Sequence, residues 1–329
     1  MSKIKIGVLS TANIAIKSVI PNILSLKEDF EFIGVASREI ENKSLDSDID
    51  LIEGYDNLLE NYNLDAVYIP LPNSMHFEWV KKALYIGINV LVEKSLSCNL
   101  KQVKELNHLA KEKNLVLLEN FQFRFHSQLN YITKLLDKGT IGDIRVFRST
   151  FCFPPFPSTD NIRYKKDLGG GALLDAGAYP IKLSQLILGS NLEVTSSVLN
   201  YGEDKEVDIW GGVFLRQKQG NLFSQIAFGF DNYYQCNVEI IGSKGKLYTN
   251  RLFTAKEDFT PTLVLETNEK GLQNIELESD NHFRNMLLYF KELFSNKNMR
   301  EEEYVNNINQ ARLLEDVRIK SNNKEISTI

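Results

Sequence analysis

The feature that most constrains this chain is the alternation of apolar, strand-like runs with helix-patterned segments over its first 120 residues. Strands are predicted at residues 3–9, 30–36, 64–70, 89–92 and 115–118. Amphipathic helices are predicted between them at 14–26, 74–85 and 100–113. Strands that alternate with helices of this length form βαβ units, whose parallel strands are covered on both faces. We therefore predict a doubly wound α/β domain with a parallel sheet over residues 1–120.

The pattern changes after residue 120. A helix is expected near 127–137, and long strand-like runs follow at 144–153, 193–200, 207–216, 222–228 and 238–248. Successive strands favour an antiparallel or mixed sheet. Helices predicted at 171–188, 282–296 and 304–321 would cover one face and leave the other open for a ligand or a second subunit. We predict an α+β domain over residues 121–329, with an open-faced, mostly antiparallel sheet that binds substrate and forms a homodimer or homotetramer.

Composition excludes several classes of protein. The formal net charge is -5 and the lysines are scattered, so we expect no nucleic-acid partner. No apolar stretch approaches 18 residues, and the first ten residues lack a signal-peptide pattern, so we expect a cytoplasmic protein with no membrane partner. Cys98, Cys152 and Cys236 lack CxxC spacing, and no other cluster has ligand spacing, so neither a disulfide framework nor a metal site is predicted.

The turn after the first predicted strand is a candidate phosphate-binding turn. A dinucleotide fingerprint would place glycines at positions 10 and 12, where this chain has Ser10 and Ala12. Small residues still allow backbone N–H groups at a helix N-terminus to approach a pyrophosphate. The cofactor-binding candidates here are Ser10, Thr11, Ala12, Asn13 and Ile14. The alternative is an ordinary strand-to-helix turn.

The second predicted strand ends in Ser37 and Arg38, and this end selects between the two nicotinamide dinucleotides. An NAD site has an acidic residue there to hold the ribose 2′-hydroxyl, whereas serine and arginine suit a 2′-phosphate. The sequence therefore predicts NADP(H). The alternative for Arg38 is a solvated surface arginine.

The third strand ends in a proline-rich loop, PLPN, at the edge of the sheet where ligands of open α/β sheets bind. Leu71, Pro72 and Asn73 are therefore cofactor-binding candidates. His76 is also a candidate, although its place inside the next helical pattern favours a packed or helix-capping histidine.

Two further constellations carry candidate chemistry. Glu93 and Lys94 directly follow an apolar strand, and a lysine near a nicotinamide can polarise or protonate a carbonyl. Asp175 and Tyr179 follow three glycines and share one face of a predicted helix, where the glycines let the backbone approach another surface. Lys94, Tyr179 and Asp175 are the catalytic candidates, and Glu93 and Lys94 are also cofactor candidates. The alternatives are a structural Glu–Lys pair and a buried Asp–Tyr pair.

Together these motifs resemble the Gfo/Idh/MocA family of oxidoreductases over essentially the whole chain. They occur in family order and spacing: PLPN at 70–73, EK at 93–94, ENFQFRFHSQ at 119–128, KGTIGDIR at 138–145 and GGGALLDAGAYPI at 169–181. The resemblance implies a Rossmann domain for NADP and a substrate domain. A narrower likeness, to nucleotide-sugar 3-ketoreductases, involves PPFP at 154–157, NIRY at 161–164 and TNRLFT at 249–254.

The resemblance also implies roles for individual residues. Lys94 and Tyr179 would flank the reacting carbonyl with Asp175 beside them, and the substrate contacts would be Gln122, Arg163, Tyr164, Asp175, Tyr179 and Arg251. The chain departs from the family pattern at Ser95, where proline is usual, in the glycine-poor turn at residues 10–12, and in a short segment at 39–50. That short segment predicts a more open adenine side of the cofactor pocket.

The expected activity is NADP-dependent reduction of a keto group, at C-3 of a nucleotide-linked deoxysugar. Alternatives within the same resemblance are an aldose or pyranose dehydrogenase, a dihydrodiol dehydrogenase and an NAD-dependent glycoside hydrolase. A non-enzymatic NADP-binding sensor is a further alternative. It has no need of Lys94, Asp175 and Tyr179 together, so the side chains favour an enzyme.

Overall fold

The computed structural model describes residues 2–39, 49–202 and 206–322. The chain divides into two compact units. The first unit contains Met1–Phe121 and Phe283–Ile308, and the second contains Gln122–His282 and Asn309–Ile329. The chain therefore leaves the first unit after Phe121, one residue from the predicted boundary, and returns to it later for residues 283–308, which are helical except for Asn296.

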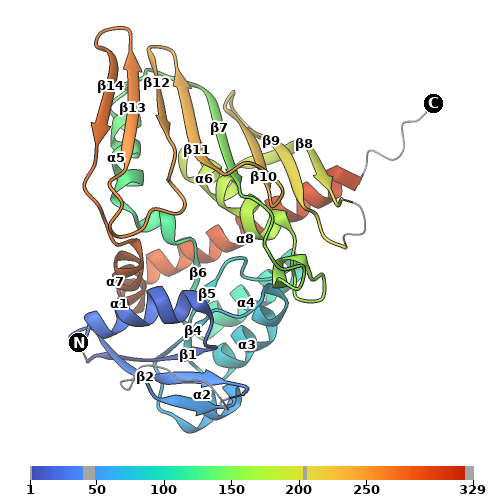
Figure 1. The fold of residues 1–329 in the computed structure, drawn as a ribbon. Coiled ribbons are helices and arrows are strands. Elements are labelled where there is room, and N and C mark those ends of the chain that lie inside the picture. Colours follow the sequence, from blue (N-terminus) through green and yellow to red (C-terminus); the bar gives the residue numbers. More distant parts are fainter. Residues whose placement is uncertain (1, 40–48, 203–205, 323–329) are drawn as a thin grey trace. The chain divides into compact units, whose positions relative to one another are not determined.

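The first unit is built on a six-stranded sheet in the order β3-β2-β1-β4-β5-β6. Its strands are β1 (Ile4–Leu9), β2 (Phe30–Ser37), β3 (Leu51–Glu53), β4 (Ala66–Ile69), β5 (Asn89–Glu93) and β6 (Leu117–Asn120). All neighbouring strands pair in parallel. The strand order reverses between β1 and β4, which is where doubly wound sheets bind ligands. This sheet confirms the predicted Rossmann-type fold (Figure 1).

Helices of the first unit are α1 (Ile20–Ser25), α2 (Tyr55–Asn61), α3 (Asn73–Tyr85), α4 (Leu100–Glu112), α7 (His282–Ser295) and the first part of α8 (Lys297–Asn322). The helix predicted at 14–26 is interrupted, because a π-helical turn, η1 (Ala15–Val19), precedes α1. Pro21 lacks a backbone N–H and opens α1, and such a residue disturbs the regular i to i−4 pattern.

The first unit departs from the prediction in its short elements and in helix α7. Strand β3 and helix α2 were not predicted, because three strand residues and seven helix residues are too short to show a period. Most of the predicted short segment at 39–50 lies outside the described residues. Helix α7 was predicted as part of the second domain but belongs to the first unit from Phe283 on, and its Lys291 forms an ion pair with Asp29.

The second unit is built on an eight-stranded sheet in the order β14-β13-β12-β11-β7-β10-β9-β8. Its strands are β7 (Ile144–Cys152), β8 (Leu192–Asn200), β9 (Trp210–Gln217), β10 (Phe223–Gly229), β11 (Gln235–Gly242), β12 (Gly245–Thr249), β13 (Thr262–Thr267) and β14 (Gly271–Glu276). Neighbouring strands pair antiparallel except β7 with β10. The predicted mostly antiparallel sheet is confirmed.

The strand predicted at 238–248 is wrong, because it is two strands that form a hairpin. Ser243 and Lys244 separate β11 from β12, and Ile241 of β11 pairs with Lys246 of β12. Strands β13 and β14 were not predicted. Every residue of β14 is exposed or half-exposed, so its sequence lacks the apolar alternation of a half-buried strand.

The second sheet has a helix-covered face and an open face (Figure 1). Helix α6 (Ala178–Leu188) packs on β7 and β10. Along β7, Phe147, Ser149 and Phe151 are buried, whereas Arg148 points the other way and is exposed. Arg148 binds Gln225 of β10 at 2.8 Å and Glu239 of β11 at 3.1 Å. The open face at the sheet centre is therefore polar.

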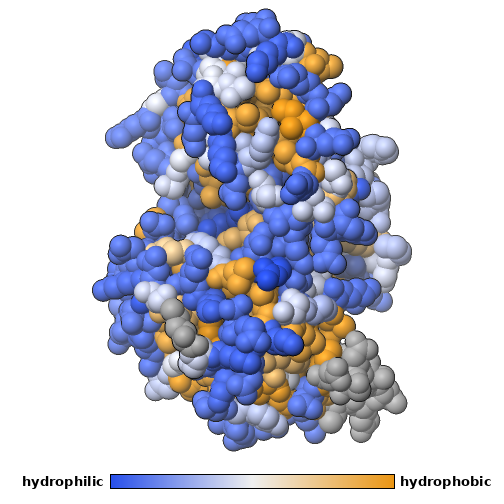
Figure 2. All heavy atoms as spheres, turned by 90° about the vertical axis from the view of Figure 1, so that its left-hand side faces the viewer, coloured by the Kyte–Doolittle hydropathy of each residue, from blue (hydrophilic) through white to orange (hydrophobic). Residues whose placement is uncertain are grey.

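The remaining helical elements of this unit are η2 (Gln122–Phe125), α5 (Ser127–Asp137), η3 (Ile162–Tyr164), η4 (Leu173–Gly177) and the part of α8 from Asn309 on. Within the described ranges, no helix combines the length and the apolar character that a membrane span requires. The surface in Figure 2 mixes hydrophilic residues with smaller hydrophobic areas, as is usual for a folded protein surface.

Candidate active site

Strand β5 ends in Glu93, whose carboxyl group is held by the two neighbouring strands. Its Oε1 accepts hydrogen bonds from the Tyr68 hydroxyl at 2.7 Å and from the Asn120 side-chain amide at 2.7 Å. Tyr68 lies in β4 and Asn120 ends β6, so three adjacent strands meet at this group. Burial raises the pKa of Glu93, while the bonds from Tyr68 and Asn120 and the charge of Lys94 oppose the rise.

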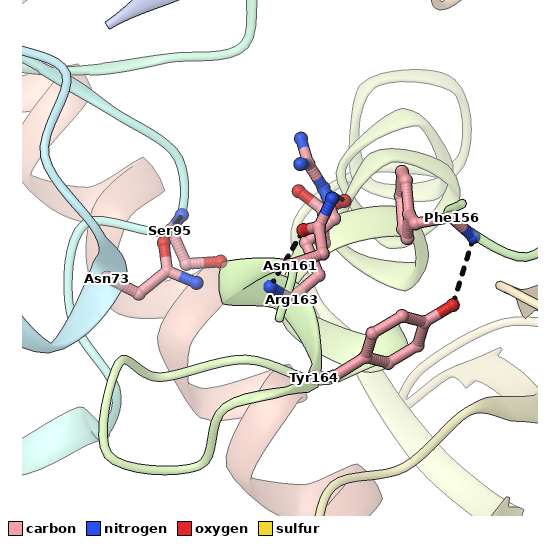
Figure 3. Close-up of polar contacts among 7 residues, drawn as sticks. Asn73, Ser95, Phe156, Asn161, Arg163 and Tyr164 are labelled. Atoms are coloured by element: carbon pink, nitrogen blue, oxygen red, sulfur yellow. Dashed lines mark hydrogen bonds and ion pairs between the residues drawn. The ribbon is translucent and has the colours of Figure 1, made fainter. Parts of the chain in front are cut away.

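The residue after Lys94 is tied to the start of α3. Ser95 is buried, and its N–H donates to Oδ1 of Asn73 at 3.1 Å (Figure 3). Its carbonyl oxygen lies 2.8 Å from Nδ1 of His76. The Lys94–Ser95 peptide bond is cis. The PLPN loop and the segment after β5, which were predicted separately, are thus joined by direct hydrogen bonds.

His76 is fully buried within the first unit. Its Nε2 lies 2.7 Å from the carbonyl oxygen of Leu71, and its Nδ1 faces Ser95. Burial lowers the pKa of His76 to about 4, so the ring is neutral at pH 7. Its position agrees with the packed histidine that the sequence favoured, and its role in cofactor binding stays a prediction.

In the turn after β1, Ser10 adopts a backbone conformation that is usually found at glycine. Ser10 has a φ of 107°, and its N–H donates to the carbonyl oxygen of Ala36 at 2.8 Å. A positive φ of this size is unusual for a residue with a Cβ and is common at functional turns. Thr11, Ala12 and Ile14 are half-buried and Asn13 is exposed. The candidate turn therefore opens beside the point where the strand order reverses.

The end of β2 presents one buried and one exposed polar residue. The Ser37 hydroxyl donates to the carbonyl oxygen of Glu39 at 2.8 Å, and Ser37 is 3% exposed. Arg38 is exposed. An exposed guanidinium at this strand end, with no acidic residue at position 37 or 38, fits the 2′-phosphate of NADP.

The second unit carries the glycine-rich segment, and two of its three glycines allow close packing. A Cβ at Gly170 would lie 2.4 Å from the carbonyl oxygen of Arg163. Gly171 has a φ of +110°, and a Cβ there would lie 2.5 Å from Oδ1 of Asp208. Asp208 accepts a hydrogen bond from the N–H of Leu173 at 2.5 Å. The predicted close approach of this backbone is confirmed, and Asp208 anchors the start of the helical segment.

Asp175 forms an ion pair with Arg163. Its Oδ2 lies 2.6 Å from Nε of Arg163, and the Arg163 guanidinium stacks over the Phe156 ring at 4.8 Å (Figure 3). The Arg163 side chain is 38% exposed and the Asp175 side chain is 18% exposed, so the pair is accessible to solvent. The structure therefore brings together two of the predicted substrate residues, at the π-helical turn η4.

Tyr179 lies one helical turn further on and has different neighbours. Its hydroxyl lies 3.4 Å from the side-chain amide of Gln122, and its ring packs against Phe123, Phe151 and Phe253. Tyr179 is 8% exposed. Gln122 and Tyr179, two of the predicted site residues, are thus neighbours in an aromatic environment.

Tyr164 and Arg251 complete the predicted substrate contacts. The Tyr164 hydroxyl accepts a hydrogen bond from the N–H of Phe156 at 3.0 Å. The Arg251 guanidinium lies over the Tyr234 ring at 4.8 Å and is 5.9 Å from the Phe259 ring. Arg251 is exposed, so its charge is oriented by aromatic rings while it remains accessible.

Sequence reasoning missed Tyr68, Asn120 and Asp208. The first two could have been found, because they lie at the ends of parallel strands beside β5, and such ends meet at one edge. Asp208 gave no local signal, because its bond to Leu173 spans 35 positions of sequence. Among the described residues, no group of three or more histidine, cysteine or acidic side chains has a metal-binding arrangement.

Two family models match the chain. The GFO_IDH_MocA model, described as an oxidoreductase family with an NAD-binding Rossmann fold, matches residues 4–121. The GFO/IDH/MocA C-terminal domain matches residues 129–248. Both matches confirm the family resemblance that the motifs indicate.

Relatives and solved structures resemble the chain, two of them over nearly its whole length. A dTDP-3,4-didehydro-2,6-dideoxy-alpha-D-glucose 3-reductase from Actinomadura kijaniata is 36% identical over 318 residues, which is 96% of this chain and 95% of that protein. A crystal structure of a 3-ketoreductase from Actinomadura kijaniata, in complex with NADP and TDP-benzene, superposes with a TM-score of 0.91 at 35% identity, covering 97% and 98% of the two chains. A D-xylose 1-dehydrogenase (NADP(+)) from Haloferax volcanii is 35% identical over 56% of this chain and 57% of its own.

Proposed function

This chain belongs to the GFO/IDH/MocA family of oxidoreductases, and from that membership we propose that it is an NADP-dependent ketoreductase. Its proposed substrate is a dTDP-linked deoxysugar with a keto group at C-3. The observation that carries the proposal is the similarity to a 3-reductase of such a sugar over 96% of this chain and 95% of that relative. The xylose dehydrogenase is similar over 56% of the chain, which makes it the weaker guide.

The first unit fits NADP by its own residues. The strand order reverses between β1 and β4, Ser10 holds the turn after β1 open, and Arg38 is exposed at the end of β2. In this proposal Arg38 and Ser37 receive the 2′-phosphate, and residues 10–14 and 71–73 line the rest of the cofactor site. When bound, NADPH supplies the hydride.

The side chains of this chain supply the rest of the chemistry. Reduction places negative charge on the carbonyl oxygen, and a cation or a proton donor directed at that oxygen lowers the barrier. We assign Lys94 and Tyr179 to this task. Asp175, fixed by Arg163, orients a sugar hydroxyl, and the charge of Arg251 serves the negatively charged part of the substrate.

Location and assembly belong to the same proposal. The three cysteines are free thiols, which is usual in the reducing cytoplasm, and we propose that compartment. We propose a homodimer or homotetramer, because the open face of the second sheet is a surface that a second subunit can cover.

The test is NADPH oxidation by purified protein given dTDP-3,4-didehydro-2,6-dideoxy-α-D-glucose, generated in situ. We expect one NADPH consumed for each sugar reduced, and a much lower rate with NADH. D-Xylose with NADP⁺ tests the pyranose dehydrogenase, and a glycoside tests the hydrolase, which shows no net use of cofactor. Efficient oxidation of xylose with no turnover of the dTDP-sugar would contradict the proposed substrate and favour a pyranose dehydrogenase.

A further inference from the structure

The backbone N–H and carbonyl groups of Ser95, the residue after Lys94, both contact side chains from the first turn of α3. The N–H of Ser95 donates to Asn73, and the carbonyl of Ser95 faces His76. Asn73 and His76 are three residues apart at the start of α3, so their side chains share one face of that helix. Ser95 is 1% exposed, so water cannot replace either partner, and an unpaired buried peptide group is costly.

His76 extends this contact to a second loop. Its other ring nitrogen faces the carbonyl of Leu71, in the loop that follows β4. The ring is 0% exposed, and both of its nitrogens face backbone carbonyl groups. Because a neutral imidazole carries one N–H, only one of the two carbonyl groups accepts a hydrogen bond from it at a time.

We propose that Asn73 and His76 are positioning residues for Lys94, which they hold through the backbone of Ser95. The direction of the Lys94 side chain depends on the backbone at positions 94 and 95, because that backbone sets where Cβ points. Glu93 on the preceding side is fixed by Tyr68 and Asn120. The lysine is thus held from both sides, by neighbouring strands before it and by α3 after it.

Two matched substitutions separate the two contacts of His76. Asparagine carries an amide N–H close to the position of Nδ1, and His76→Asn retains a donor for Ser95. Glutamine carries its amide close to the position of Nε2, and His76→Gln retains a donor for Leu71 only. Asn107→Leu is the control for general destabilisation, because Asn107 is a buried side chain of the same unit that binds Tyr304 and Asn307.

The kinetic arm rests on the proposed function. We expect His76→Gln and Asn73→Leu each to lower kcat by about tenfold, the effect of one lost hydrogen bond on the barrier, and we expect His76→Gln to leave NADPH affinity unchanged within about twofold. His76→Asn should retain most of the wild-type kcat. In a Lys94→Ala background, His76→Gln should cost no more than about twofold, because a positioning residue loses its effect when its target is absent.

A second arm does not depend on the substrate. The lysines are dimethylated with ¹³C-formaldehyde, and the Lys94 methyl resonance is assigned from its loss in Lys94→Arg. We expect that resonance to shift in His76→Gln and Asn73→Leu, and to stay at its wild-type position in His76→Asn and Asn107→Leu. Equal spectra in all folded variants would overturn the inference, as would full additivity of His76→Gln with Lys94→Ala. Failure of the proposed function alone leaves the NMR result standing.

Discussion

The strand ends around Lys94 and the helix that carries Asp175 and Tyr179 hold their polar groups in different ways. Around Lys94, the partners of Glu93 are buried side chains from adjacent strands of one sheet. Asp175 instead pairs with an arginine from a loop, and that pair is partly exposed. The first arrangement has its partners inside one sheet, shielded from solvent. The second remains accessible to solvent.

The two regions also differ in what anchors them. The strand-end region is held by hydrogen bonds within the sheet and by the start of α3. The helix region depends on the close approach of Gly170 and Gly171 to Arg163 and Asp208. A substitution at a glycine should therefore disturb the second region, whereas a substitution at a buried polar partner should disturb the first.

We expect the largest effects from substitutions of Lys94 and Tyr179, which test whether the strand-end region and the helix region act in the same chemical step. Lys94→Ala and Tyr179→Phe should each lower kcat by about 10²- to 10⁴-fold, with NADPH affinity nearly intact. The double variant should lose less than the product of the two single losses, because groups that act on one transition state are not additive. Stopped-flow absorbance of NADPH in single turnovers measures this. Full single-turnover rates in both folded single variants would remove these residues from the mechanism.

Acid stability compares the same two units through one buried histidine in each. Burial lowers the pKa values of His76 and His282 to about 4 from 6.5. The unfolded chain binds these protons first, so the stability that each neutral ring provides is complete above pH 6.5 and is lost as the pH falls to 4. The loss is roughly 3 kcal/mol for each ring.

Amide hydrogen exchange between pH 7 and pH 4, corrected for intrinsic rates, reports each unit separately. We expect His76→Gln to flatten the pH dependence in the first unit and His282→Gln to flatten it in the second. Flattening in both units by either variant would show that the units unfold together. If the pH dependence of exchange were the same in both variants as in the wild type, the lowered pKa values of His76 and His282 would be contradicted.

A glycine pair tests the anchoring of the helix region. Gly171 and Gly189 both have positive φ, +110° and +89°, but a Cβ at Gly189 would meet nothing within 4 Å. We expect Gly189→Ala to cost about 1 kcal/mol of unfolding free energy from backbone strain. Gly171→Ala should cost about 2 to 4 kcal/mol, because the contact with Asp208 adds to the strain. Equal losses in urea unfolding would show that close packing at Gly171 is unimportant.

The smallest expected effect concerns the cofactor edge of the first unit. Arg38→Ala should weaken NADPH binding by more than about 1 kcal/mol, the value of a charge-assisted contact, and leave NADH binding unchanged. Calorimetric titration with both cofactors measures the difference. Equal losses for NADPH and NADH would mean that Arg38 does not contact the 2′-phosphate.

The first region was largely predictable from sequence, for a physical reason. Apolar strands that end in polar residues place those residues at one sheet edge, and this rule found Glu93, Lys94 and the PLPN loop. It did not reveal that the backbone of Ser95 contacts both Asn73 and His76, because those contacts depend on how far α3 is shifted along the direction of β5. The periodicity of the sequence gives no information about such a shift.

The second region was predictable in part. The glycines, Asp175 and Tyr179 were visible as a motif, and Arg163 was proposed only through a family resemblance. The link from Leu173 to Asp208 spans 35 positions of sequence, and Asp208 lies just before β9, in a stretch that was predicted as part of a strand. The hairpin of β11 and β12 was missed because its two strands form one continuous β-type run around a short turn.

A tracer experiment with NADPH deuterated at the transferred position of the nicotinamide tests whether the protein delivers hydride to C-3 of the sugar. The dTDP-linked 3-keto sugar is reduced to completion and the product is analysed by ¹H and ²H NMR. We expect one deuterium for each sugar, bound at C-3, with one NADP⁺ formed. Deuterium at another carbon, or a sugar product without deuterium, would contradict this expectation.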